Sequence, residues 1–172
     1  MKTICPPLSK SMHRLIAVHR RKVSGFTLVE LLVTILVAGI LASMAAPSFT
    51  GIIASQRTKS VASDLHNTLV GARSEATKRN LSITVAPVGG SAWENGWQIY
   101  PSATPTNILG NYSAAKTVTI TSTSSPVIYQ NSGRVQNAVM FVITATSGSS
   151  SAQRCVSVDL SGRPYVKAGA SC

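Results

Sequence analysis

The stretch from Gly25 to Pro47, GFTLVELLVTILVAGILASMAAP, decides how the N-terminal part of this chain folds. The 22 residues that follow Gly25 are almost all apolar, and Glu30 is the only charged residue among them. A helix of this length spans about 33 Å, close to the roughly 30 Å hydrocarbon core of a bilayer. We therefore predict a transmembrane helix. Its carboxylate needs a partner, because a charge at the helix centre costs roughly 2.5–3.5 kcal/mol.

Basic residues are concentrated before this stretch. The 172-residue chain has a formal net charge of +11, and six of its 16 lysines and arginines precede Gly25, where no acidic residue occurs. Because Lys and Arg beside a membrane segment stay cytoplasmic, we predict a cytoplasmic leader, residues 1–25, and a C-terminal part outside the membrane. The high net charge is thus partly a property of the leader, which weakens a general inference of nucleic-acid binding.

Three interpretations of the apolar stretch compete. It could be a secretory signal peptide cut near Ser43–Ala45, a plain signal anchor, or a segment retained after a cut between Gly25 and Phe26. Glu30 favours the third, because a signal peptide gains nothing from a carboxylate. After such a cut Glu30 is the fifth residue, and it can pair with the new amine of Phe26 on a neighbouring subunit or on its own chain.

Residues 25–32, GFTLVELL, resemble the processing signal of type IV pilins and type II secretion pseudopilins. The resemblance implies that a prepilin peptidase cuts between Gly25 and Phe26 and methylates the amine of Phe26. It also implies a single-pass inner-membrane protein with a periplasmic C-terminal domain. Residues 26–47 then form the polymerisation helix of a filament, in which Glu30 guides subunit register. The sequence leaves open whether translation starts at Met1 or Met12.

The chain after the apolar stretch continues with helical periodicity. Pro47 and Gly51 are predicted to interrupt the helix, because proline removes a backbone donor and glycine adds backbone freedom. Residues 48–80 then form an amphipathic continuation that ends near Asn80. Its apolar stripe, which we expect to pack on a sheet, consists of Val61, Leu65, Leu69, Ala72 and Ala76.

Residues 81–172 are predicted to form an antiparallel β domain. Short alternating or apolar segments separated by turn residues indicate strands within 81–88, 97–100, 117–135 (two strands), 138–146, 154–160 and 163–168. Residues 102–116 are expected to form a loop. The fold class is therefore α+β, a long N-terminal helix packed on an antiparallel sheet.

That order of elements matches the pilin fold. The segments GWQIY (96–100), NSGRV (131–135) and CVSVDLSGRPYVK (155–167) resemble the GspH/FimT family of minor pilins and pseudopilins. The resemblance implies a structural subunit that primes or caps a type IV pilus or a type II secretion pseudopilus. Its partners would be other subunits and an assembly platform. An alternative function is a pilus-associated DNA receptor for natural transformation. The sequence does not separate a pilus from a secretion system.

Two cysteines remain once the leader, with Cys5, is removed. Cys155 and Cys172 fall in the part of the chain predicted to be exported, where disulfides persist. We predict a disulfide between them. Closing a loop of this length contributes roughly 3 kcal/mol in the chain-entropy model.

A basic and aromatic stripe near the C-terminus is the candidate DNA-binding site. Arg163, Tyr165 and Lys167 alternate along a predicted strand and so share one face. Phosphate contacts and base stacking could hold DNA there. Some members of the FimT branch resemble DNA-uptake receptors and have a C-terminal Gly-Arg-x-Arg motif. Residues 162–165 of this chain are Gly-Arg-Pro-Tyr, so Tyr165 stands in place of the second arginine. The competing interpretation is an edge strand, marked by Pro164, whose charges discourage aggregation.

The sequence offers no candidate for catalysis, metal binding or a cofactor. His66 is the only histidine after Gly25, and the two exported cysteines are assigned to a disulfide. We therefore expect that the protein is not an enzyme. Trp93 and Trp97 are predicted to pack in the sheet. Arg134 is predicted to be a turn charge, and the alternative is that it joins a basic patch.

Overall fold

The computed structural model describes residues 25–172 except 91, 114 and 116, and it does not describe the side chains of 44–48. The predicted leader, with Cys5 and the alternative start Met12, therefore lies outside the described residues. The chain divides into two compact units after Gly39, and the second unit, Ile40–Cys172, contains the whole β structure.

A single helix, α1 (Leu28–Arg79), precedes every strand. It continues through Pro47 and Gly51, so the predicted interruption was wrong. A proline removes only one hydrogen bond of the helix, and tertiary contacts begin in the next turn. There the hydroxyls of Thr50 and Ser150 lie 3.0 Å apart, and the backbone of Gly51 lies against Ser150. The helix ends as predicted, because Asn80 follows with a left-handed φ of 52°.

The predicted stripe is the buried face of α1. Leu65, Leu69, Ala72 and Ala76 are fully buried and Val61 is partly buried. The buried face extends further than predicted, because it also includes Ala54, Thr58, Ala62 and Thr68. Its many small side chains let the helix backbone lie close to the strands that cover it.

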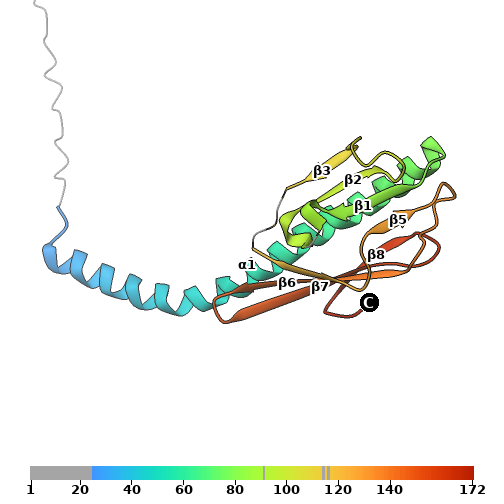
Figure 1. Cartoon of the computed structure of the whole chain (residues 1–172). Helices are drawn as coiled ribbons and strands as arrows, with labels where there is room; N and C mark the ends of the chain where they lie inside the picture. The colour runs from blue at the N-terminus through green and yellow to red at the C-terminus, as the bar shows by residue number, and fades with distance from the viewer. Residues whose placement is uncertain (1–24, 91, 114, 116) are drawn as a thin grey trace, which may run out of the picture. The chain divides into compact units, whose positions relative to one another are not determined.

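Two antiparallel four-stranded sheets cover this helix face, where we expected one sheet (Figure 1). The first has the order β3-β2-β1-β5 and the second the order β4-β6-β7-β8. The strands are β1 (Ile83–Pro87), β2 (Trp97–Pro101), β3 (Gly110–Tyr112), β4 (Thr119–Ser122), β5 (Val127–Tyr129), β6 (Val139–Ser147), β7 (Ser150–Val158) and β8 (Pro164–Ala168), with short 3-10 turns η1 (Val88–Gly90) and η2 (Trp93–Asn95).

Most predicted strands are confirmed, and the differences are local. Leu81, the first residue of the predicted strand segment 81–88, precedes β1 and is exposed. The expected loop 102–116 contains β3, which pairs with β2 through Trp97–Tyr112. Chain neighbours β4 and β5 belong to different sheets, because residues 123–126 carry the chain from one sheet to the other.

Both tryptophans lie in the core, as predicted. The Trp93 ring meets Phe141 edge-on at a centroid distance of 4.8 Å, and the Trp97 ring stacks on Tyr112 at 5.6 Å. The indole nitrogen of Trp97 donates a hydrogen bond to the Thr68 hydroxyl at 2.9 Å. This bond joins the first sheet to the C-terminal half of α1, so the core has a fixed polar contact as well as apolar packing.

Candidate functional site

The predicted processing bond lies directly before α1. Phe26 is exposed, and the helix begins two residues after it at Leu28. Thr27 caps the helix, because its carbonyl accepts from the Leu31 N–H at 3.1 Å and its hydroxyl accepts from the Glu30 N–H at 3.2 Å. A cut between Gly25 and Phe26 therefore leaves a complete helix start on the C-terminal product.

Glu30 occupies the third helical position after this cap. A carboxylate in the first turn interacts favourably with the positive end of the helix dipole. The pattern Thr-x-x-Glu is a capping-box signature, which sequence reasoning about Glu30 missed. Within the described residues the ion pairs are Lys78–Glu75 and Arg79–Glu75, so the Glu30 carboxylate has no cationic partner in that part of its own chain.

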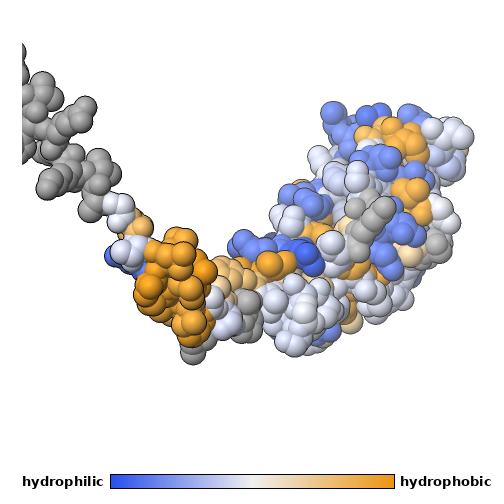
Figure 2. All heavy atoms as spheres, turned by 90° about the vertical axis from the view of Figure 1, so that its left-hand side faces the viewer, coloured by the Kyte–Doolittle hydropathy of each residue, from blue (hydrophilic) through white to orange (hydrophobic). Residues whose placement is uncertain are grey.

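Apolar side chains cover the N-terminal part of α1, as Figure 2 shows. The exposed ones include Leu28, Val29, Leu31, Leu32, Val33, Ile35, Leu36, Val37, Ile40 and Leu41. Among the described residues, no helix combines the length and the apolarity that crossing a membrane requires.

The disulfide between Cys155 and Cys172 is present, as predicted. The two Cα atoms lie 5.7 Å apart, and Cys155 is fully buried on β7. The bond ties the segment after β8 back to β7, the strand that pairs with β8.

Two of the three residues of the candidate DNA stripe, Tyr165 and Lys167, lie on β8, whereas Arg163 lies in the turn before it. Arg163 directly precedes β8, while Tyr165 and Lys167 pair with Ser157 and Cys155 on the face away from the core. All three are exposed, and 45% of Tyr165 is accessible. β8 is the outer strand of its sheet, so its position also agrees with the edge-strand interpretation.

Two Gly-Arg turns meet beside this stripe. Gly133 and Gly162 both have positive φ, at 77° and 79°. A Cβ on Gly162 would collide with the Gly133 carbonyl and would lie 3.3 Å from the Arg134 Cα, so the backbones of the two turns touch. Arg134 and Arg163, 29 positions apart in the sequence, are therefore on neighbouring turns.

A third arginine comes from α1. A Cβ on Gly133 would lie 3.3 Å from Nε of half-buried Arg73. Sequence reasoning missed Arg73, because its helical position gives no sign that it faces the turn at Gly133. We call Arg73, Arg134 and Arg163 the arginine cluster. Three separate elements supply its members.

One carboxylate lies at the second of these turns. Asp159 accepts hydrogen bonds from the Ser161 hydroxyl and from the Arg163 N–H at 3.3 Å. The Ser161 bond is the main cause of the lowered pKa of Asp159, and the Arg163 N–H adds to it. The carboxylate is therefore ionised at neutral pH and holds the turn that presents Arg163.

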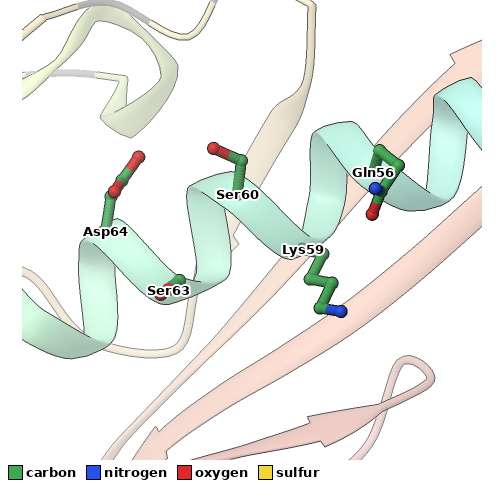
Figure 3. A pocket seen from close by; sticks show the side chains of 5 residues that line it. All are labelled: Gln56, Lys59, Ser60, Ser63 and Asp64. Atoms are coloured by element: carbon green, nitrogen blue, oxygen red, sulfur yellow. The ribbon is translucent and has the colours of Figure 1, made fainter.

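The surface hollow in Figure 3 is formed by α1 alone. Gln56, Lys59, Ser60, Ser63 and Asp64 line it, and Lys59 points to one side of the helix while Ser60 and Asp64 point to the other. A single helix cannot enclose a small molecule, so this hollow lacks the concave shape of a ligand site. Across the described part of the chain, no group of three or more His, Cys, Asp or Glu side chains could hold a metal ion.

The family model described as type II transport protein GspH matches residues 61–162, and the prokaryotic N-terminal methylation motif matches residues 20–46. The chain belongs to the GspH family. Members are structural pilin subunits, and the methylation motif implies processing by a prepilin peptidase and other pilins as partners. No curated protein matches this chain.

Two crystal structures of the type IV minor pilin FimU from Pseudomonas aeruginosa PAO1 are similar to this member of the GspH family. The P21 form is 22% identical, with a TM-score of 0.58, and the match covers 68% of this chain and 96% of FimU. The P65 form is also 22% identical, with a TM-score of 0.56 and coverage of 66% and 98%. These likenesses confirm the predicted pilin fold.

Proposed function

We propose that this protein is a minor pilin or pseudopilin that is cut between Gly25 and Phe26 and then primes or caps a thin filament. The observation that carries the proposal is the position of the methylation motif. The methylation motif ends at residue 46, within α1, and the C-terminal half of the same continuous helix contributes the buried helix face of the GspH domain. In this proposal residues 26–47 span the inner membrane before assembly and pack among other subunits afterwards, with the leader cytoplasmic.

Glu30 guides assembly in this proposal by pairing with the methylated amine of Phe26. Its lack of a cationic partner among the described residues supports the assignment. Glu30→Gln removes the charge but keeps the backbone N–H that Thr27 caps. We expect normal membrane insertion and processing but loss of incorporation into sheared filaments. Thr27→Val, which weakens the cap and keeps the carboxylate, is the matched control. Normal incorporation of Glu30→Gln would overturn the pairing.

A pilus and a secretion pseudopilus can be separated by the major subunit that the protein contacts. Disulfide or chemical crosslinking in membranes, followed by mass spectrometry, identifies that subunit. Crosslinks to a major pilin support pilus priming, whereas crosslinks to a major pseudopilin support the secretion role. An absence of crosslinks to either subunit contradicts a filament function.

A second candidate function is binding of DNA during uptake. The contact between the two Gly-Arg turns favours it, because it gathers the arginine cluster beside Tyr165 and Lys167. Guanidinium groups can bind phosphates, and an exposed tyrosine ring can stack on a base. The two turn segments, 131–135 and 159–163, contain one acidic residue, Asp159, against Arg134 and Arg163, and Arg73 adds a third positive charge.

This second function is tested by titrating labelled duplex DNA at several salt concentrations. Arg163→Ala and Lys167→Ala should each weaken binding and lower the slope of log affinity against log salt by about 0.9 per lost phosphate contact. Lys59→Ala, a basic residue on exposed α1 surface, is the control. If all three variants bind alike, the attraction is general and the stripe is a solvated edge strand.

A further inference from the structure

We propose that a polar hollow between α1 and the β4–β6 edge binds a phosphate oxyanion, and that the headgroup of a membrane phospholipid supplies it. The hollow has a volume of about 310 Å³. We call it the Arg57 hollow, and its lining consists of Arg57, Thr117, Val118, Thr119, Thr144 and Thr146. The lipid assignment depends on the membrane insertion proposed above, whereas the phosphate site itself does not.

Arg57 is a half-buried cation that has no counter-charge in the part of the chain that the structure describes. The ion pairs among the described residues both involve Glu75, and no hydrogen bond of the Arg57 side chain occurs there. The residues that line the hollow include no carboxylate. A partly desolvated guanidinium favours an anionic ligand, and its planar set of N–H donors fits two phosphate oxygens.

The edge of β6 adds backbone donors to the hollow. β4 pairs with β6 only as far as Thr119–Thr144, while β6 continues to Ser147. The Met140 carbonyl accepts from the Thr123 N–H at 3.0 Å, so the backbone groups of even-numbered β6 residues face β4. The N–H of Thr146 therefore points to the same side, beyond the last β4 partner.

Hydroxyl groups complete the set of donors. The hydroxyls of Thr117, Thr119 and Thr146 make no hydrogen bond to any described residue. Each hydroxyl can donate to an oxyanion without giving up an existing bond. A guanidinium, a strand-edge N–H and free hydroxyls together suit phosphate better than a neutral or cationic ligand.

The position of the hollow on α1 points to a lipid as the source. Phe49, Ile52 and Ile53 are the last large apolar side chains exposed on the helix before Arg57, and Ile53 is 42% accessible. Ile53 and Arg57 are four residues apart and so lie on the same helix side, separated by about 6 Å along the axis. The stretch from Phe26 to Ile53 is longer than the hydrocarbon core, at about 42 Å of helix, and such a helix tilts to keep its exposed apolar side chains against acyl chains. With Ile53 at the end of the acyl region, headgroup phosphates reach the level of Arg57.

The test measures phosphate binding by the full-length protein in dodecylmaltoside, a detergent without phosphate. The probes are dihexanoylphosphatidylglycerol, dihexanoylglycerol without a phosphate, and inorganic phosphate. The readout is the side-chain Nε–Hε NMR signal of Arg57, identified by its loss in Arg57→Gln. We expect a saturable shift with the phospholipid and none with dihexanoylglycerol. Native mass spectrometry of the same samples should show at least tenfold weaker lipid retention in Arg57→Gln.

Lys59→Gln is the matched control, because it removes one positive charge two residues away at a side chain that does not line the Arg57 hollow. Lys59 lines the other hollow, the one that Figure 3 shows. It should retain lipid as the unmodified protein does. Equal losses in both variants would overturn the site in favour of diffuse charge attraction. Arg57→Lys keeps the charge without the planar donors and should have intermediate affinity. Unchanged tryptophan fluorescence shows that each variant is folded.

The remaining outcomes separate the sources of phosphate. Binding of inorganic phosphate alone overturns the lipid assignment, and binding of neither probe overturns the phosphate site. If neither binds but Arg57→Gln blocks filament incorporation, the ligand is a carboxylate of a neighbouring subunit. Carbonate extraction of cell membranes tests insertion independently. If the unmodified protein is extracted, the proposed membrane function fails, while the detergent measurements still decide the phosphate site.

Discussion

The buried hydrogen bond between Trp97 and Thr68 gives the sharpest test of how α1 is fixed to the β domain. Thr68 has no exposed surface and Trp97 has 2%. Thr68→Val keeps the shape of the side chain but removes the oxygen that accepts the indole N–H at 2.9 Å. Since no solvent reaches the indole nitrogen, its desolvation is then uncompensated. We expect the free energy of unfolding to fall by about 1–3 kcal/mol.

Thr58→Val provides the control on the same helix. Thr58 is also buried, but its hydroxyl donates only to the Ala54 and Ser55 carbonyls at 3.3 and 2.9 Å. Those carbonyls can keep their backbone hydrogen bonds within α1 when the hydroxyl is lost. The substitution should therefore be close to neutral, and it carries the same change in helix propensity as Thr68→Val.

Equilibrium denaturation of the full-length protein in detergent measures both variants. Far-UV circular dichroism follows the helix, and fluorescence follows the two tryptophans, which both lie in the core. The difference between Thr68→Val and Thr58→Val isolates the cost of the unpaired indole. Equal destabilisation of the two variants would falsify the inference that this bond holds α1 to the first sheet.

Three further predictions concern the C-terminal region and its turns. Replacing Cys155 and Cys172 by serine should lower the free energy of unfolding by about 3 kcal/mol, measured by denaturation against the oxidised protein. Gly162→Ala should lower the melting temperature more than Gly89→Ala, because both have positive φ but only Gly162 faces backbone atoms. Asp159→Asn should lower the free energy of unfolding above pH 3.8, because the fold stabilises the ionised carboxylate and so lowers its pKa. Below pH 3.8 the unmodified protein loses this stabilisation as the carboxylate is protonated, so the free energy of unfolding should fall less steeply in the variant.

Local sequence patterns were enough to predict much of the architecture. The spacing of Leu65, Leu69 and Ala72 identified the buried helix face, because helical periodicity depends only on nearby residues. Asn80 marked the end of the helix for the same reason. The Thr-x-x-Glu pattern of Thr27 and Glu30 also predicts a helix cap, but we did not use it.

Contacts between distant segments could not be predicted in this way. A strand pattern shows which face is buried but does not name the partner strand, so the division into two sheets was not foreseen. The continuity of α1 through Pro47 likewise depends on contacts such as that between Thr50 and Ser150, which are 100 positions apart.

The sequence by itself determined the candidate processing bond, the apolar helix, the pair Cys155 and Cys172 and the alternation of Arg163, Tyr165 and Lys167. Each of these follows from the order of residues within one short segment. Only the tertiary structure placed Arg73 beside the Gly133 turn and opened the hollow beside Arg57. The physical reason is that packing between a helix and strand edges depends on the whole fold, and side chains distant in sequence meet only after those elements have paired.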